Sequence, residues 1–274
     1  MESDSEIEIV DSHCHLNFDL FDDDRDAVVE NARRIGISRI LNPGIDIETS
    51  KSAIEIAHTY PEVFAAVGVH PNQGLSWNEH SLPELRKLAK NDKVVAIGEI
   101  GLDYYRQVTP VKVQQSIFTQ QLELAAELGL PVVIHLRDSA EDLVKILREW
   151  YSEVLKSGSI LANNPGVIHS FSGEPDLANE LALLNFKIGI SGPVTFRNSH
   201  QLQSTVVNTP IESILVETDA PFLAPHPNRG KRNEPANVRI VADKIADLKD
   251  TSLNEIALIT KLAADKLFKW SENH

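Results

Sequence analysis

The sequence predicts an α/β fold, a (β/α)₈ barrel with additional C-terminal helices. Two observations lead to this prediction. Short runs rich in valine, isoleucine and other apolar residues alternate with longer amphipathic segments, and eight such runs can be counted in 274 residues. Most of these runs are continuously apolar, which is typical of parallel strands buried on both faces. Eight strand and helix units in about 250 residues fit a barrel, and a doubly wound open sheet is the alternative.

The predicted strands are short and are separated by amphipathic segments. They occupy residues 7–11, 38–44, 64–70, 94–102, 131–136, 166–173, 187–192 and 214–219. Helices are predicted between them where apolar residues recur at helical spacing, as in residues 24–35 and 114–128, each followed by a glycine, and in residues 175–184. This order of elements favours crossover helices between parallel strands.

Two further amphipathic segments follow the eighth predicted strand, at residues 233–248 and 251–270. The second begins with Ser252 and Glu255 in the spacing of a capping box. The chain contains no low-complexity stretch and no long linker rich in proline, glycine and serine. We therefore expect residues 1–274 to form one domain.

Composition limits the class of protein. Hydrophobic residues make up 42% of the chain, as is ordinary for a globular protein. The single cysteine, Cys14, excludes an intramolecular disulfide, and the acidic first residues lack the pattern of a signal peptide. We expect an intracellular location, in the cytoplasm or, in a eukaryote, also in the nucleus. No apolar run reaches the roughly 18 residues of a membrane span, so no membrane association is expected. No obligate protein partner is evident from the sequence.

The net charge of −14 argues against tight binding of a long DNA duplex through many phosphates. A local exception is the segment 225–239, where four basic residues stand against one acidic residue and give a net charge of +3. This segment follows the eighth predicted strand, so we expect it at the rim of the barrel. Arg229 and Lys231 are candidate phosphate contacts, because Gly230 between them permits close approach. A solvated loop is the alternative.

Histidines and carboxylates stand at the carboxyl ends of the predicted strands, where barrel enzymes carry their working residues. His13 and His15 lie two positions apart and would point to the same side of an extended chain. Glu99 lies within an apolar strand, where an unpaired carboxylate is costly, so it should meet a cation or hydrogen-bond donors. A polar strand end and a structural ion pair are the respective alternatives.

Three further strand ends carry His135, His169 and Asp219. Each alone is compatible with a satisfied core polar group. Together with the previous three, they provide four imidazoles and two carboxylates, enough to bind two divalent ions with one bridging carboxylate. Imidazoles favour zinc, whereas carboxylates also suit manganese or magnesium. The pattern predicts a dinuclear hydrolase in which Asp219 is the general base or, alternatively, only a sixth ligand.

Further polar residues lie beside these candidate ligands. His70 ends the third predicted strand and is a candidate contact to a phosphate or leaving group, with a structural hydrogen bond as the alternative. Arg106 and Arg137 each follow a ligand-bearing strand and are candidate phosphate contacts, with surface salt bridges as the alternative. Asp103 is expected to orient a ligand imidazole, and Tyr104 or its neighbour could stack on a base.

Six segments of the sequence resemble the TatD family of metal-dependent deoxyribonucleases. They are DSHCHL from Asp11, GVHP from Gly68, GEIGLDYYR from Gly98, HLRDS from His135, HSFSG from His169 and ETDAPFLAPHPNRGKRNEPANV from Glu217. The resemblance spans nearly the whole chain, and the third and last segments are its most specific parts. Departures from the family pattern at Asn17, Ser139 and Ser170 affect no candidate ligand.

The resemblance implies a (β/α)₈ barrel, two divalent metal ions and hydrolysis of phosphodiester bonds in DNA, typically from the 3′ end of single-stranded DNA. Carried over by motif, one ion would be bound by His13, His15 and Asp219. His135 and His169 would bind the other ion, and Glu99 would bridge the two.

Two other functions compete with the nuclease. Similar dinuclear barrels hydrolyse small esters, amides or aminoacyl substrates, but the basic rim and the absence of a lysine where Glu99 stands favour the nuclease. A binding or scaffold protein that keeps only the fold is the second competitor. The presence of all six candidate ligands argues against it.

Overall fold

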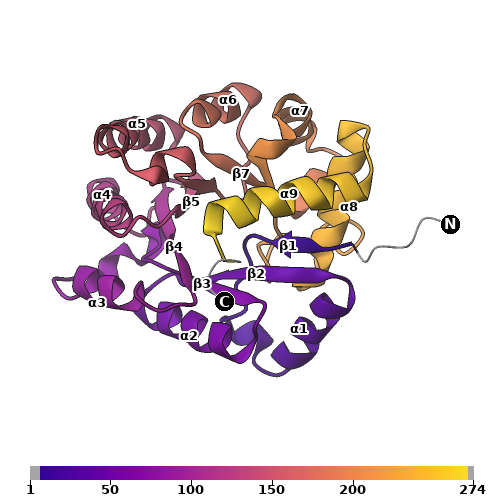
Figure 1. Ribbon diagram of the computed structural model, residues 1–274, viewed down its shortest axis with the longest axis horizontal. Helices are drawn as coiled ribbons and strands as arrows, with labels where there is room; N and C mark the ends of the chain where they lie inside the picture. The colour runs from indigo at the N-terminus through magenta and orange to yellow at the C-terminus, as the bar shows by residue number, and fades with distance from the viewer. Residues whose placement is uncertain (1–6, 271–274) are drawn as a thin grey trace.

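The computed structural model describes residues 7–270, and within this range it has eight parallel strands in the sheet order β1 to β8 (Figure 1). Every strand pairs with its neighbours in the sequence. The strands are β1 (Ile9–Asp11), β2 (Ile37–Pro43), β3 (Val63–Val67), β4 (Val94–Asp103), β5 (Val132–Arg137), β6 (Gly166–Ile168), β7 (Lys187–Ile190) and β8 (Ile214–Val216). Helices between successive strands complete the pattern, so the predicted (β/α)₈ barrel is confirmed.

The ring closes between the segments that follow β1 and β8. The backbone amide of Ser12 donates to the carbonyl of Val216 at 3.0 Å, and that of Asp219 donates to His13 at 2.9 Å. An isolated parallel bridge pairs Cys14 with Ala220. These contacts lie at or just beyond the carboxyl ends of β1 and β8, so the seam of the barrel runs through the segments that carry the candidate ligands His13, His15 and Asp219.

The α-helices of the described chain form an outer ring, except for the last. They are α1 (Arg25–Arg34), α2 (Ile47–Thr59), α3 (Ser81–Leu88), α4 (Val111–Leu128), α5 (Ala140–Lys156), α6 (Pro175–Leu183), α7 (His200–Asn208), α8 (Val238–Lys249) and α9 (Leu253–Phe268). Gly129 ends α4 in the left-handed conformation, as its position predicted. The Ser252 hydroxyl accepts from the Glu255 amide and caps α9.

Two apolar clusters fill the molecule. The larger lies between the strands and the outer helices. The smaller fills the inside of the barrel with residues near the amino ends of the strands, such as Val10 and Phe64, and includes Phe268 and Trp270 at the end of α9. Figure 1 shows α9 lying across the ring of strands. It therefore closes the amino end of the barrel and leaves the carboxyl end accessible.

Four strands end two or more residues earlier than the sequence predicted. β3 stops at Val67 and β7 at Ile190, whereas residues 70 and 192 were the predicted ends. β6 stops at Ile168 and β8 at Val216, and the chain then turns at Ser170 and Asp219, which both have positive φ. The turns bring the side chains of these segments into the mouth of the barrel. No helix within residues 7–270 combines the length and the apolar character needed to cross a membrane. The acidic first residues used for the signal-peptide argument lie mostly outside the described range.

Candidate metal centre

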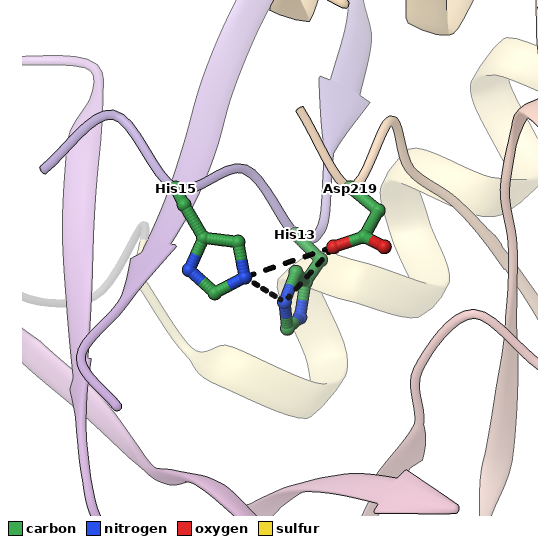
Figure 2. A group of neighbouring side chains, drawn as sticks. All are labelled: His13, His15 and Asp219. Carbon is green, nitrogen blue, oxygen red and sulfur yellow. Dashed lines mark hydrogen bonds and ion pairs between the residues drawn. The ribbon is translucent and has the colours of Figure 1, made fainter. Parts of the chain in front are cut away.

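The segments after β1 and β8 bring three candidate ligands together. Figure 2 shows the imidazoles of His13 and His15 and the carboxylate of Asp219 pointing toward one another. The Nε2 atoms of the two histidines are 3.2 Å apart. Asp219 Oδ1 lies 3.8 Å from Nε2 of His13 and 3.6 Å from that of His15. The spacing of two residues on an extended chain therefore places both imidazoles on one side, as predicted.

Glu99 lies at the centre of the site and uses its two carboxylate oxygens in different directions. Oε2 lies 3.5 Å from His13 Nε2 and 3.4 Å from His15 Nε2. Oε1 lies 2.8 Å from His169 Nε2 and 3.1 Å from His135 Nδ1. One oxygen therefore faces the two histidines that follow β1, and the other faces the histidine in β5 and the one that follows β6. This is the geometry required of a bridging carboxylate.

The structure adds His70 to the six candidates. Its Nδ1 accepts from the backbone amide of Asn72 at 3.0 Å, so its Nε2 is turned toward the site, 3.3 Å from Glu99 Oε1. His70, Glu99 and His135 form one possible ligand group, and His13, Glu99 and His169 form another. The sequence offered no metal-binding partner for His70, because its neighbours come from β4 and β5 rather than from its own strand.

The donor atoms fit divalent cations. A tetrahedral zinc ion with bonds of about 2.0 to 2.1 Å to nitrogen separates its ligand atoms by roughly 3.3 Å, and here His13 and His15 Nε2 are 3.2 Å apart. Both side chains are almost fully buried. Two buried imidazole nitrogens facing each other and two carboxylates are the arrangement that a bound cation satisfies.

Burial tunes the protonation of these groups. It lowers the pKa of His13 well below its usual range and that of His15 to about 4, so both imidazoles are neutral and able to bind a metal. Burial opposes ionisation of Glu99, but the charges of His169 and His70 and hydrogen bonds from other histidines hold its pKa well below the usual range. Glu99 is therefore ionised, as a bridging ligand must be.

The pKa values of Asp219 and His169 are raised rather than lowered. Burial raises the pKa of Asp219 to about 7. A carboxylate with such a pKa can accept a proton at neutral pH. Burial opposes protonation of His169, but the charges of Glu99 and Glu217 outweigh it and raise the pKa of His169 well above the usual range.

Two further buried carboxylates, Asp103 and Glu217, contact histidines of the candidate metal centre. Asp103 Oδ2 lies 3.2 Å from His135 Nε2 and accepts from the Asn72 amide at 3.0 Å, so Asp103 contacts the imidazole that it was expected to orient. On the other side, Glu217 Oε1 lies 3.8 Å from His169 Nδ1 and accepts from the Ser170 amide at 2.5 Å.

Asp11 and Glu217 were not singled out from the sequence. Asp11 accepts from the Thr218 amide and hydroxyl at 2.9 and 2.6 Å and so links the ends of β1 and β8. A side chain at Gly189 would meet Glu217 Oε2 at 2.1 Å, so the glycine makes room for this carboxylate. Both carboxylates are fully buried at the ends of apolar runs, and that placement was the available signal.

Comparison with known proteins agrees with this geometry. The model of the family described as TatD related DNase matches residues 10–269. The chain belongs to the TatD-related DNase family. It is 40% identical over 261 residues to the metal-dependent hydrolase YabD of Bacillus subtilis, covering 95% of this chain and 99% of that protein.

Other members of the family cover nearly the whole chain. The 3′-5′ ssDNA/RNA exonuclease TatD of Cronobacter sakazakii is 35% identical over 255 residues, covering 90% of this chain and 93% of the relative. The crystal structure of the TatD homologue YJJV from Escherichia coli is 29% identical, covers 96% of this chain and 98% of that chain, and superposes with a TM-score of 0.88. The protein is therefore a TatD-family metal-dependent hydrolase, an enzyme of the class that acts on ester bonds.

The centre lies at the bottom of a cavity of about 970 Å³ at the carboxyl end of the barrel. Three of the predicted substrate contacts line it, namely His70, Arg106 and Arg137. Arg229 and Lys231 are exposed and lie outside the residues that line this cavity. The guanidinium of Arg229 lies 4.5 Å above the ring of Phe196.

The basic segment after β8 carries less free charge than its composition indicated. Arg232 forms ion pairs with Asp24 at 2.6 Å and with Glu234 at 3.0 Å. Its guanidinium also lies 4.8 Å above the ring of Phe21. Arg232 therefore connects this segment to the start of α1. The two arginines that line the cavity, Arg106 and Arg137, lie instead after β4 and at the end of β5.

Proposed function

We propose that this TatD-family hydrolase is a deoxyribonuclease that removes nucleotides from the 3′ end of single-stranded DNA and uses two divalent metal ions. The observation that carries the proposal is the position of Glu99, whose two oxygens face two separate groups of histidines. A relative named 3′-5′ ssDNA/RNA exonuclease, 35% identical to this chain, supports the substrate and the polarity.

In this proposal the ligands divide between two ions. His13, His15 and Asp219 would hold the first ion, His135 and His169 would hold the second, and Glu99 would contribute to both. Such ions, whether magnesium, manganese or zinc, make water a stronger acid and offset negative charge on phosphodiester oxygens. The ring of His169 lies close to that of His13, and the ring of His70 lies close to that of His135. This closeness supports a compact centre in which a histidine of one group could also contact the ion of the other.

The protein's own side chains supply the remaining steps. Asp219, a buried carboxylate beside the two histidines that follow β1, accepts the proton of the attacking water. Arg106 and Arg137 on the cavity wall bind phosphates of the strand. His70, whose Nδ1 accepts from the Asn72 amide, turns its Nε2 toward the site, where it can hydrogen-bond to the scissile phosphate or the leaving oxygen. With two arginines on the wall and a net charge of −14, the enzyme is suited to strand ends rather than to long duplexes.

The proposal is tested by mononucleotide release from single-stranded DNA. Protein stripped of metal is supplied with magnesium, manganese or zinc, and a free 3′ end is compared with a blocked one. We expect metal-dependent release from the free end alone. Uptake of two ions per chain without release from any oligonucleotide would contradict the nuclease and favour a small ester, amide or aminoacyl substrate.

A further inference from the structure

Two exposed apolar side chains at the mouth of the cavity have no role in the chemistry proposed above. Phe222 is 48% exposed and Leu223 is 39% exposed, and both line the cavity. They follow Asp219 by three and four residues. Apolar groups left open beside a polar site often mark a surface that a ligand covers.

The loop that carries Phe222 is held in place by hydrogen bonds. The Phe222 amide donates to the Asp219 carbonyl at 2.8 Å, and the Phe222 carbonyl accepts from Asn233 Nδ2 at 2.8 Å. The backbone amide of Asn233, a fully buried residue, donates to the Pro221 carbonyl at 3.0 Å. The ring of Phe222 is therefore presented by a fixed backbone, and little ordering is needed when a ligand binds it.

Phe222 is continuous with the candidate metal centre through a group of rings. The ring of Phe18 stacks on His15 with centroids 4.5 Å apart and planes 17° apart. Phe222 meets Phe18 edge-on at 5.9 Å and His15 at 6.3 Å. A flat group lying on the exposed part of Phe222 is thus next to the ligands His15 and Asp219.

The opposite wall of the cavity is cationic. Phe222 follows β8, whereas Arg106 and Arg137 follow β4 and end β5. Since β8 and β4 are four strands apart in a ring of eight, these residues face one another across the mouth. The guanidinium of Arg137 lies 4.0 Å above the ring of Tyr105, which holds it in place.

The two walls match the two ends of a nucleotide strand. Each internal nucleotide carries a negatively charged phosphate, whereas the nucleoside at a free 3′ end adds a neutral base and no further phosphate. Charge complementarity therefore directs the phosphates to the arginines and the terminal base to the apolar wall. Bases stack on aromatic side chains irrespective of their sequence.

We propose that Phe222 is a specificity-determining residue that stacks on the 3′-terminal base of the strand being shortened. The inference rests on the proposed nuclease function. A base paired within a duplex cannot lie against Phe222, so the enzyme selects ends whose last base is unpaired. The next residue, Leu223, also lines the cavity and adds apolar surface beside the base.

The test compares two enzymes on two substrates. One substrate is a single-stranded oligodeoxynucleotide with an ordinary 3′-terminal nucleotide, and the other ends in a sugar that lacks the base. With metal bound, the wild type should favour the first substrate in kcat/KM by about 5- to 150-fold, the range expected for stacking of one base on an aromatic ring. Phe222→Ala should lose this preference, and Phe222→Trp should restore it.

A control variant separates the effect from a general loss of surface apolar area. Leu258→Ala on α9 removes a side chain that is 56% exposed at the other end of the barrel, and it should keep the preference. Metal content and the melting temperature of each variant show whether it is folded and loaded.

The outcomes distinguish the inference from the function on which it rests. If the wild type releases nucleotides from neither substrate with any metal, the nuclease proposal fails. If the wild type cleaves both substrates equally, or Phe222→Ala keeps the preference, the nuclease stands and the stacking role of Phe222 is wrong.

Discussion

At its amino end the barrel is filled by aliphatic and aromatic side chains from the strands and α9, whereas at its carboxyl end the same strands present histidines and carboxylates. Trp270 is fully buried at the first end, and Glu99 is almost fully buried at the second. Burial of an apolar ring stabilises the fold, while burial of a carboxylate costs free energy unless a cation or donors compensate it. The amino end therefore stabilises the fold, and the carboxyl end carries the candidate metal centre.

The largest effect is expected at the carboxyl end from Glu99→Gln. If Glu99 bridges two ions as proposed, a neutral amide cannot replace its carboxylate, so we expect hydrolysis to fall on the order of 10³-fold and metal content to fall as well. Turnover and bound metal per chain are the measurements. The matched control is Glu127→Gln, which changes an exposed residue of α4 paired with Arg86 and should leave both unchanged. Normal turnover by Glu99→Gln would remove the bridging role.

The next effect is expected at the amino end from Trp270→Ala. The ring packs on Phe64 and Phe268, with centroids 5.6 and 4.9 Å apart, so its removal should lower the free energy of unfolding by about 3 to 5 kcal/mol. Urea unfolding measures this loss. At a low temperature, at which Trp270→Ala is still folded, the metal-loaded variant should retain its turnover. A large loss of turnover at normal metal content would show that the two ends are not independent.

A smaller effect is expected from Glu217→Gln. This variant tests whether the buried carboxylate next to His169 contributes to metal binding or turnover. Outer partners of ligand histidines are typically worth about 10- to 100-fold in metal affinity or activity. We expect a loss in this range, because the amide gives up the charge that faces His169 Nδ1 at 3.8 Å. Metal titration of the apoprotein measures it. Unchanged affinity and turnover would assign Glu217 to packing of the barrel alone.

The smallest effect is expected from Asp24→Asn at the rim. The Arg232 hydrogen bond lowers the pKa of Asp24. A carboxylate whose pKa is lower in the folded than in the unfolded state adds stability above its ordinary pKa, and this stability is lost as pH falls through the folded-state value. The melting temperatures of the two proteins should therefore differ slightly near pH 7 and converge in acid, once the pH has fallen through the lowered pKa of Asp24. A difference that persists in acid would exclude the ion pair as its cause.

The sequence was sufficient for the strands but not for their lengths. Continuous apolar runs predicted eight strands, because a strand buried on both faces cannot carry many polar residues. Nothing in those runs showed that β6 and β8 stop early, since the turns depend on positive φ at Ser170 and Asp219, which are not glycines. The amphipathic pattern likewise predicted α9 but not that it closes the amino end, because periodicity gives a buried face and not its partner.

For the candidate site, the sequence likewise predicted the candidate ligands but not all of the contacts between them. Six candidate ligands were predicted at or near strand ends, because their recurrence on several strands outweighed the structural alternative that each one has alone, and the structure brings all six together. The grouping of His70 with His135 required the sheet order, which places β3, β4 and β5 side by side. Arg232 was counted as free charge because the sequence does not show that the segment after β8 returns to Asp24. Contacts between distant segments therefore account for what the sequence could not give.

The seam between β1 and β8 has a consequence for how the enzyme matures. Asp11 and Thr218, which hydrogen-bond across it, are 207 positions apart, and Asp219 joins His13 and His15 only there. A ribosome must therefore synthesise most of the protein before this ligand group can exist. A nascent chain carrying the first histidines alone lacks the third member, so the proposed ligand group of the first ion is complete only after the ring has closed.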